Sequence, residues 1–391
     1  MRILWVSHFV PFPPAGGALQ RTYHLLRHAA ARHEIHLLAL NQPRLLPTLA
    51  ARAEACDALS QLCASVRVIE QPAERSSIHR LATVVRSVFS DEPFDVRWMR
   101  SRELRAALSG WHSRSGIDLV HVDTIGLWPV MASWRRSPIV LGHHNVESDL
   151  ATRRAGRESN PVVAALLRSD AAKLRALETQ AARQVGLNVV VSRADAERLA
   201  DIVPGAPIAI VDNGVDTTFL RRDTDTPPTP GTIVFAGTLG WYPNRDAVEF
   251  LLREIWPTLR AANDRRRLLL VGRDPPAMGT HDERVEVTGF VADVRSYLQR
   301  ASIYVCPIRV GGGTRLKVLD ALAMSLPLVA TAAAVEGLEL IEGIHYLRAE
   351  TAGDFITAIE RLERDQALQR RMREAGRSLV VERYDWTRIG R

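Results

Sequence analysis

Short apolar runs recur along the chain, and most of them are followed by a stretch with helical periodicity. Seven lie in the first part of the chain, at 3–6, 34–40, 65–70, 118–123, 138–142, 187–192 and 208–211. Five more lie at 232–236, 268–272, 285–288, 303–308 and 328–331. Runs that stay apolar instead of alternating are typical of parallel strands covered by helices on both faces. We therefore predict an α/β protein built from doubly wound sheets.

The length of 391 residues is too great for one ordinary core, so two domains are expected. The stretch 222–231 contains three prolines among threonines and aspartates, which is typical of an exposed linker. We predict a first domain at 1–221, a linker at 222–231, a second domain at 232–375 and a closing helical segment at 376–391.

The composition is that of a soluble globular protein, with 46% hydrophobic and 24% charged residues. The formal charge of +7 favours polyanions, anionic lipid surfaces or phosphorylated small molecules as partners. Because no nucleic-acid-binding motif accompanies this charge, we expect no nucleic-acid partner. The three cysteines have no metal-binding or redox spacing, which indicates reduced thiols and a cytoplasmic protein.

Any contact with a membrane is expected to be peripheral, without a segment that spans the bilayer. The first apolar run is too short for a signal peptide, and no apolar run reaches membrane-spanning length. The segment 97–111 places four arginines beside Leu104, Leu108 and Trp111 at helical spacing. Such a segment either packs inward with its arginines in water or lies on an anionic membrane.

A glycine loop, Gly311, Gly312 and Gly313, separates the apolar run 303–308 from a helical stretch that leads to the run 328–331. Glycines allow the backbone to approach a ligand closely. The amides of Thr314, Arg315 and Leu316 would then be the unpaired donors of a helix N-terminus, where anions are favoured. This pattern predicts a phosphate site, and it is not a Walker A loop because Gly-Lys-Ser/Thr does not occur.

Lys317 and Asp320 lie three residues apart and share one face of this helix. A cation would neutralise a diphosphate, and a carboxylate would accept hydrogen bonds from ribose hydroxyls. The alternative is an exposed Lys–Asp pair above a glycine turn.

Polar residues also follow strands of the first domain. Gly16 and Gly17 lie between the first strand and a helix, where α/β folds bind ligands, although a simple helix-starting turn would look the same. His143, His144 and Asn145 directly follow the strand 138–142, and we favour a substrate contact there over a structural role. Metal binding would need further ligands at suitable spacing, so no metal is expected.

Taken in order, these motifs resemble glycosyltransferase family 4 (group 1), which are retaining enzymes of the GT-B fold, and in particular members associated with exopolysaccharide assembly. The resemblance covers nearly the whole chain. It rests on 16–17, 144–147 (His-Asn-Val-Glu), 213–216 (Asn-Gly-Val-Asp), 235–237 (Phe-Ala-Gly), 242–244 (Tyr-Pro-Asn), 288–290 (Thr-Gly-Phe), 313–327, 336–338 and 384–386 (Tyr-Asp-Trp).

The resemblance implies two Rossmann-like domains that face a central cleft, with a last helix that crosses back to the first domain. It implies transfer of a hexosyl group from a UDP- or GDP-sugar to a hydroxyl of a glycan or lipid-linked saccharide, with retention of configuration, in polysaccharide or glycoconjugate biosynthesis. The protein would be cytoplasmic or peripheral on the inner face of the membrane. No cofactor or metal is expected, because amides, the helix dipole and basic side chains would carry the leaving-group charge.

The resemblance also assigns residues. His144, Lys317 and Asp320 would be catalytic, with His144 at the donor sugar and Asp320 in place of the second glutamate of the family's Glu-x7-Glu motif. The donor would contact Gly237, Asn244, Gly289, Phe290, Arg309, Gly311, Gly312, Gly313, Thr314, Arg315 and Leu316. Gly16, Gly17 and Asn145 would contact the acceptor or the sugar.

Two departures from the family pattern leave alternatives open. Gly312 replaces the first glutamate of the motif, and the expected Arg–Lys phosphate pair is reduced to Arg273. Arg309, Arg315 or Lys317 would have to supply the missing charge. A nucleotide-sugar epimerase and a non-catalytic subunit that binds a nucleotide or a glycan are therefore kept as alternatives.

Overall fold

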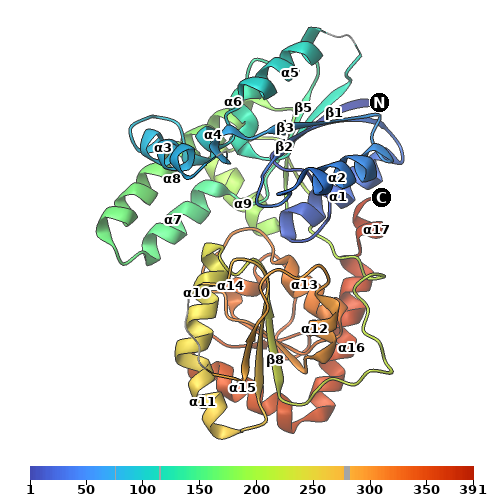
Figure 1. Ribbon diagram of the computed structural model, residues 1–391, viewed down its shortest axis with the longest axis vertical. Helices are drawn as coiled ribbons and strands as arrows, with labels where there is room; N and C mark the ends of the chain where they lie inside the picture. Colours follow the sequence, from blue (N-terminus) through green and yellow to red (C-terminus); the bar gives the residue numbers. More distant parts are fainter. Residues whose placement is uncertain (75, 114–115, 277–281) are drawn as a thin grey trace. The chain divides into compact units, whose positions relative to one another are not determined.

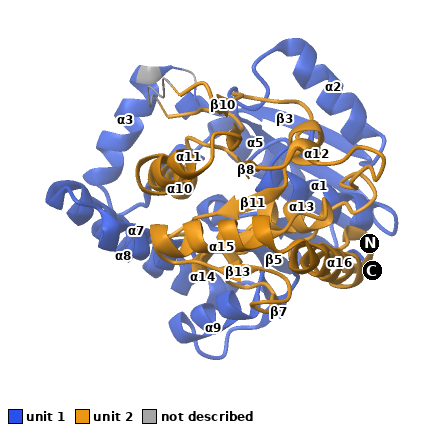
Figure 2. Cartoon of the chain, turned by 90° about the horizontal axis from the view of Figure 1, so that it is seen from below, with its two compact units in different colours: residues 1–212, 390–391 blue, residues 213–389 orange. Residues whose placement is uncertain are grey.

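The computed structural model describes residues 1–74, 76–113, 116–276 and 282–391 (Figure 1). It divides into two compact units, coloured separately in Figure 2. Unit 1 comprises Met1–Asp212 with Gly390–Arg391, and unit 2 comprises Asn213–Ile389.

The proline-containing stretch 222–231 is a surface segment of unit 2. The guanidinium of Arg222 donates to the carbonyl oxygen of Gln299 at 2.6 Å, and the amide of Thr229 donates to that of Arg300 at 2.9 Å. The units divide ten residues before the predicted linker begins, at Asp212 and Asn213. Hydrogen bonds to one unit therefore hold a stretch whose composition alone indicates a linker.

Unit 1 is built on a parallel seven-stranded sheet in the order β3-β2-β1-β4-β5-β6-β7. Its elements are β1 (Arg2–Ser7), α1 (Gly17–Ala30), β2 (Glu34–Asn41), α2 (Leu49–Ser60), β3 (Ser65–Glu70), η1 (Pro72–Glu74), α3 (Ser77–Val88), α4 (Phe94–Trp98), α5 (Arg102–Ser113), β4 (Leu119–Val122), η2 (Ile125–Leu127), α6 (Trp128–Met131), β5 (Ile139–Gly142), α7 (Glu147–Arg157), α8 (Pro161–Gln184), β6 (Leu187–Val190), α9 (Arg193–Ile202) and β7 (Ile208–Ile210). All seven predicted strands are present.

The first strand shows why these runs are apolar on both sides. Ile3 and Trp5 lie in a buried cluster with residues of α1 and α2. Leu4 and Val6 point the other way, into a cluster with residues of α5 and α6. Because successive side chains of a strand point to opposite faces, a sheet covered on both faces needs apolar residues at every position.

Unit 2 repeats this architecture with a parallel six-stranded sheet in the order β10-β9-β8-β11-β12-β13. Its elements are β8 (Thr232–Ala236), α10 (Tyr242–Phe250), the π-helical turn η3 (Leu251–Ile255), α11 (Trp256–Ala262), β9 (Arg267–Val271), β10 (Val285–Val287), α12 (Arg295–Arg300), β11 (Ile303–Cys306), α13 (Leu316–Ala323), β12 (Leu328–Ala330), α14 (Ala332–Val335), β13 (Leu347–Arg348), α15 (Ala352–Arg364), α16 (Gln366–Arg383) and α17 (Trp386–Ile389). The five predicted strands are confirmed, and β13 was missed because two residues leave no pattern.

The residues 352–383 are rich in arginine and glutamate and predict one helical tract, but the structure has two helices there, α15 and α16. The carboxylate of Asp365 accepts a hydrogen bond from the amide of Leu368 at 2.8 Å and caps the start of α16. A residue that caps one helix has non-helical backbone angles, so α15 ends there. Beyond α17, the carbonyl oxygen of Arg391 accepts from Arg32 at 2.8 Å within unit 1.

The arginine-rich segment 97–111 packs inward. Leu104 and Leu108 of α5 are buried in the core under the sheet of unit 1. The apolar face of this segment is therefore not available to a membrane. Within the described parts of the chain, no helix is long and apolar enough to span a bilayer.

Candidate functional site

Both sheets reverse their strand order at one place, next to β1 and β4 in unit 1 and next to β8 and β11 in unit 2. In open α/β sheets, ligands bind beyond the carboxyl ends of the strands at such a switch point. The loops that follow these strands carry most of the predicted site residues.

Two glycines bring the loops of unit 2 together. A Cβ atom on Gly237, whose φ is 149°, would lie 2.7 Å from Nζ of Lys317 and 3.1 Å from Nδ2 of Asn244. A Cβ atom on Gly272, whose φ is 143°, would lie 1.7 Å from the carbonyl oxygen of Gly237. Both positions thus need glycine, for the backbone angle and for the space.

The glycine loop leads into α13, whose first turn has no side-chain cap among the described residues. The amide of Val318 donates to the carbonyl oxygen of Arg315 at 2.9 Å, and no described side chain caps this end of the helix, as a phosphate site requires. The Arg315 side chain is 4% exposed and turns back on the loop, where it donates to the carbonyl oxygens of Gly312, Gly313 and Ala333. The guanidinium thus fixes the loop, and a phosphate contact at Arg315 would come from its amide.

Lys317 lies against Asn244, although the two are far apart in the sequence. Its ammonium donates a hydrogen bond to Oδ1 of Asn244 and lies 4.6 Å from the ring centroid of Phe235. Nδ2 of Asn244 in turn donates to the carbonyl oxygen of Thr238 at 2.7 Å. Burial lowers the pKa of Lys317 to about 8, so the side chain still carries its charge at neutral pH.

Asp320 presents an unfilled acceptor one turn further along α13. Its Oδ1 atom is buried and has no hydrogen-bond partner among the residues described. Burial raises the pKa of Asp320 to about 7, and the nearby Lys317 offsets part of this effect. A buried carboxylate oxygen without a partner is costly, which favours a ligand that donates hydrogen bonds here.

Arg309 and Phe290 complete the predicted donor residues of unit 2. Arg309 forms a bidentate ion pair with Asp246, at 2.7 and 3.0 Å, so its charge is already matched. Phe290 follows Gly289, which has a φ of 70°, and the residue is 61% exposed. The guanidinium carbon of Arg273 lies 5.2 Å from the centroid of that ring.

In unit 1, His144 belongs to a cluster around the buried carboxylate of Asp123. Nε2 of His144 lies 3.7 Å and Nδ1 of His8 lies 3.6 Å from Oδ2 of Asp123. The same oxygen accepts from the hydroxyls of Ser7 at 3.1 Å and Thr22 at 2.8 Å. Asp123 is thus the centre of a polar network at the switch point of this sheet.

The charge of this network is set by the histidines. Burial alone would raise the pKa of Asp123, but the neighbouring imidazoles of His121, His144 and His8 hold it well below its usual value. Burial lowers the pKa of His8. Asp123 therefore stays ionised, with ring nitrogens of His8, His121 and His144 within 4 Å of its carboxylate.

A family model described as Glycosyltransferase Family 4 matches residues 15–219, and one described as Glycosyl transferases group 1 matches 230–365. The chain belongs to glycosyltransferase family 4. No curated protein is significantly similar in sequence to this glycosyltransferase.

Solved structures agree with this fold along the whole chain. Sucrose-phosphate synthase from Thermosynechococcus elongatus is 18% identical with a TM-score of 0.73, and the match covers 100% of this chain and 96% of that one. HepE from Anabaena, in complex with UDP and glucose, is 15% identical with a TM-score of 0.68, and the match covers 100% and 97%. The predicted GT-B fold is thereby confirmed.

Two residues beside His144 of the glycosyltransferase have structural partners. Nε2 of His143 lies 3.0 Å from Oδ1 of Asn188, and burial lowers the pKa of His143 to about 4. Nδ2 of Asn145 donates to Glu147 at 3.0 Å. The predicted contact of Asn145 with acceptor or sugar stays a prediction.

The glycine loop of unit 1 keeps a backbone shape that favours glycine. Gly16 has a φ of 120°, and its carbonyl oxygen accepts from the amide of Gln20 as α1 begins at Gly17. A Cβ atom on Gly16 would meet nothing within 4 Å. The backbone angle at Gly16 therefore favours glycine, while the space beside the residue is open.

His8 and Asp123 are site residues that the sequence analysis missed. A usable signal was present, because Asp123 ends a predicted strand and His8 lies two residues beyond one, as His144 does. Together the three offer ligand atoms within 4.8 Å of one another, a donor set that a transition metal accepts. The metal-free reaction implied by the sequence stays a prediction.

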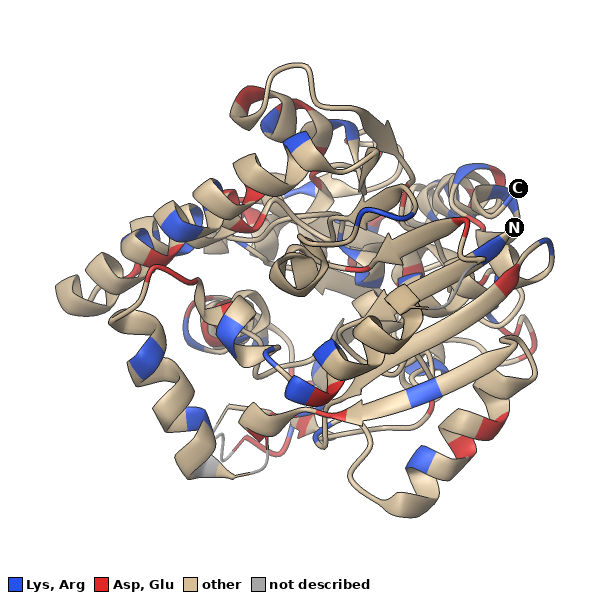
Figure 3. Cartoon of the chain, turned by 90° about the horizontal axis from the view of Figure 1, so that it is seen from above, with Lys and Arg blue, Asp and Glu red and all other residues tan. Residues whose placement is uncertain are grey.

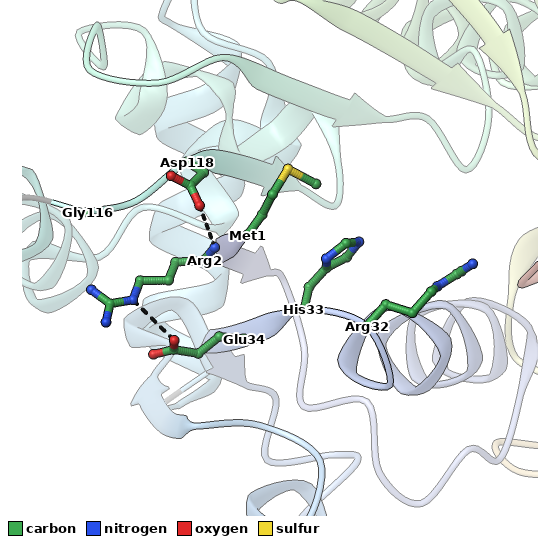
Figure 4. A pocket seen from close by; sticks show the side chains of 7 residues that line it. All are labelled: Met1, Arg2, Arg32, His33, Glu34, Gly116 and Asp118. Atoms are coloured by element: carbon green, nitrogen blue, oxygen red, sulfur yellow. Dashed lines mark hydrogen bonds and ion pairs between the residues drawn. The ribbon is translucent and has the colours of Figure 1, made fainter.

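A surface pocket at the other edge of unit 1 is separate from these residues (Figure 4). It lies where β1 and β2 begin, and its lining includes Arg2, Glu34 and Asp118. The amide of Arg2 donates to Asp118 at 2.7 Å, and its guanidinium donates to Glu34 at 3.1 Å. Because these charges satisfy one another at the amino ends of the strands, we assign the pocket no role in transfer.

Proposed function

We propose that this glycosyltransferase moves a hexosyl group from a UDP-sugar to a hydroxyl of a glycan or lipid-linked saccharide, in polysaccharide or glycoconjugate biosynthesis. The anomeric configuration is retained and no metal takes part. HepE, a structural neighbour, has been solved with UDP-glucose, which favours uridine over guanosine in the donor.

The observation that carries this proposal is the pair of unmet requirements on α13. The helix begins with amides that lack a side-chain cap among the described residues, and Asp320 holds a buried oxygen without a described partner. A nucleoside diphosphate supplies both missing partners, with phosphate oxygens for the amides and ribose hydroxyls for the carboxylate. The ammonium of Lys317, on the same helix, neutralises the diphosphate.

The transfer step then follows from charge and position. The bond between the anomeric carbon and the diphosphate oxygen breaks, and its electron pair leaves with the diphosphate. The acceptor oxygen bonds to the anomeric carbon on the same face and passes its proton to an oxygen of the departing diphosphate. The amides of Thr314 to Leu316 and Lys317 stabilise the departing charge, while Asp123 holds His144 in position at the sugar.

A panel of nucleotides tests the donor site. UDP and UDP-hexoses are expected to raise the melting temperature of the wild-type chain, because a ligand that binds only the folded state stabilises it. Asp320→Asn should weaken that effect, while the exposed Asp293→Asn serves as the matched control. The proposal is refuted if no nucleoside diphosphate stabilises the wild-type chain.

A transfer assay tests the reaction. The wild-type chain, incubated with the stabilising UDP-hexose and saccharide acceptors, is expected to yield UDP and a glycoside whose anomeric configuration, read by NMR, equals that of the donor. An inverted product would contradict the retaining mechanism alone.

One observation favours a second candidate, a non-catalytic subunit that binds a nucleotide. Gly312 stands where the family has a glutamate, and its carbonyl oxygen accepts a hydrogen bond from Arg315. UDP binding without transfer or hydrolysis, across a range of acceptors, would support this candidate over the enzyme.

A further inference from the structure

Helix α3 in unit 1 turns its apolar side to solvent. Ile78 is 79% exposed, Leu81 64% and Phe89, just beyond the helix, 85%. Val84, Val85 and Val88 are exposed as well. At 3.6 residues per turn these six side chains fall on one stripe along the helix.

The opposite side of α3 attaches it to the rest of unit 1. The side chain of Ser87 is buried, and its backbone carbonyl oxygen accepts a hydrogen bond from Nζ of Lys173 on α8 at 2.8 Å. Arg80 donates to Glu74 at 3.0 Å and lies over the ring of Trp98. The helix is thus fixed through its polar side, and the outward apolar stripe is its built orientation.

The charge on this helix has one sign. Between residues 77 and 88 there are two arginines, Arg80 and Arg86, and neither aspartate nor glutamate. Figure 3 shows the basic residues of the chain in blue and the acidic residues in red. Arg86 and His79 are exposed and border the apolar stripe on one side. An apolar face with basic residues along its border is the pattern of a helix that lies in the surface of an anionic membrane.

The size of the stripe decides between two occupants. A helix of 12 residues is about 18 Å long. An interfacial helix lies in the plane of the membrane and buries its apolar face about 5–10 Å deep, which one stripe of this kind is sufficient for. A stable contact with a second copy needs roughly 1,200 Å² or more of buried surface, which one such stripe does not supply.

We propose that α3 is a membrane-docking helix that inserts Ile78, Leu81, Val85 and Phe89 below the headgroups of an anionic lipid surface. Arg86 then lies at the level of the phosphates. This assigns membrane contact to residues 78–89, in place of the 97–111 segment whose apolar side is buried. Docking of this kind would hold the chain where a lipid-linked acceptor is found, but it does not depend on the transfer reaction.

Vesicle flotation of the full chain tests the proposal. Wild type is expected to float with vesicles of phosphatidylcholine and phosphatidylglycerol, and less with phosphatidylcholine alone. The triple variant Leu81→Gln, Val85→Gln, Phe89→Gln should lose at least about tenfold in partitioning, because it removes three inserted apolar side chains. Arg86→Gln should weaken flotation with the anionic vesicles alone.

A matched control separates insertion from general surface hydrophobicity. Val287, Ile341 and Ile344 are exposed apolar residues of unit 2, and replacing all three with glutamine should leave flotation unchanged. Melting temperatures of both triple variants should stay near wild type, because the replaced side chains are exposed. The proposal is overturned if the α3 variant floats like wild type, if wild type floats with neither vesicle, or if light scattering shows a dimer that the α3 variant dissociates.

Discussion

Replacing Lys317 with methionine isolates the contribution of one charge to donor binding. Methionine keeps an apolar stem of similar length but removes the ammonium that lies beside Asn244 and above Phe235. A hydrogen bond to a charged group contributes about 1.5–3 kcal/mol. We therefore expect UDP affinity to fall by roughly 10–150-fold, at about 1.4 kcal/mol per factor of ten.

Calorimetric titrations with UDP and with uridine separate the phosphate contact from every other effect. Uridine lacks the diphosphate, so Lys317→Met should bind it as wild type does. The chain has one other lysine, Lys173, and Lys173→Met is the matched control that should leave UDP binding unchanged. An equal loss for UDP and uridine, or no loss for UDP, would refute the role of Lys317.

The pH dependence gives an independent check on the same charge. Because burial lowers the pKa of Lys317 to about 8, the ammonium loses its proton as the pH rises through that value. Wild-type affinity for UDP should therefore decline above pH 8, whereas that of Lys317→Met should not show this decline. The unfolded chain holds this proton more tightly than the folded chain, so the charge opposes folding at pH 7. The variant should thus melt no lower than wild type, which excludes unfolding as the cause of weaker binding.

Other residues of the site give further predictions. Asp320→Asn should weaken UDP by about tenfold but leave a deoxyribose analogue unaffected, since a charge-assisted hydrogen bond to ribose is lost. Because burial raises the pKa of Asp320 from 3.8 to about 7, its charge opposes folding increasingly between these pH values and fully above pH 7. In denaturant titrations the variant should be more stable than wild type by about 4 kcal/mol at pH 8, with the difference shrinking below pH 7. Gly237→Ala should cost about 1–3 kcal/mol of unfolding free energy, because its φ of 149° and the contact with Lys317 both oppose a Cβ atom. Gly110→Ala is its control, and should add about 0.5–1 kcal/mol, since this helical glycine has open space around it. His144→Ala should lower kcat by about 100-fold or more with an unchanged melting temperature, and a metal chelator should leave wild-type kcat unchanged; activity lost to the chelator would contradict the metal-free reaction.

The sheets were predictable because every strand except β13 leaves a local signal. Every apolar run of the sequence became a parallel strand, and their spacing led to two doubly wound sheets. The incorrect predictions of strands and helices lie at positions where the sequence has no local pattern. Leu347–Arg348 is too short to show periodicity, and Asp365 changes from a helical position to a cap through one side-chain hydrogen bond.

The candidate site was predictable where its residues share one helix. Lys317 and Asp320 are three residues apart, so helical geometry places them on one face. The network around Asp123 is different, because three strand ends far apart in the sequence supply its members. Strand order decides which ends meet, and the order next to β1 and β4 places His8 beside Asp123. The local pattern of a single strand does not specify the order of the strands in the sheet.

Helices α3 and α5 show the same limit for membrane contact. Both have apolar residues at helical spacing with arginines beside them, so the pattern alone gives both the same interpretation. In α5 the stripe is covered, as Leu104 and Leu108 lie in the core. In α3 the anchoring contacts, from Lys173 to the backbone of Ser87 and from Arg80 to Glu74, lie on the polar side, and the stripe remains outside. Amphipathic periodicity therefore fixes that a helix has an apolar side, while contacts from distant elements decide whether that side meets the core or a surface.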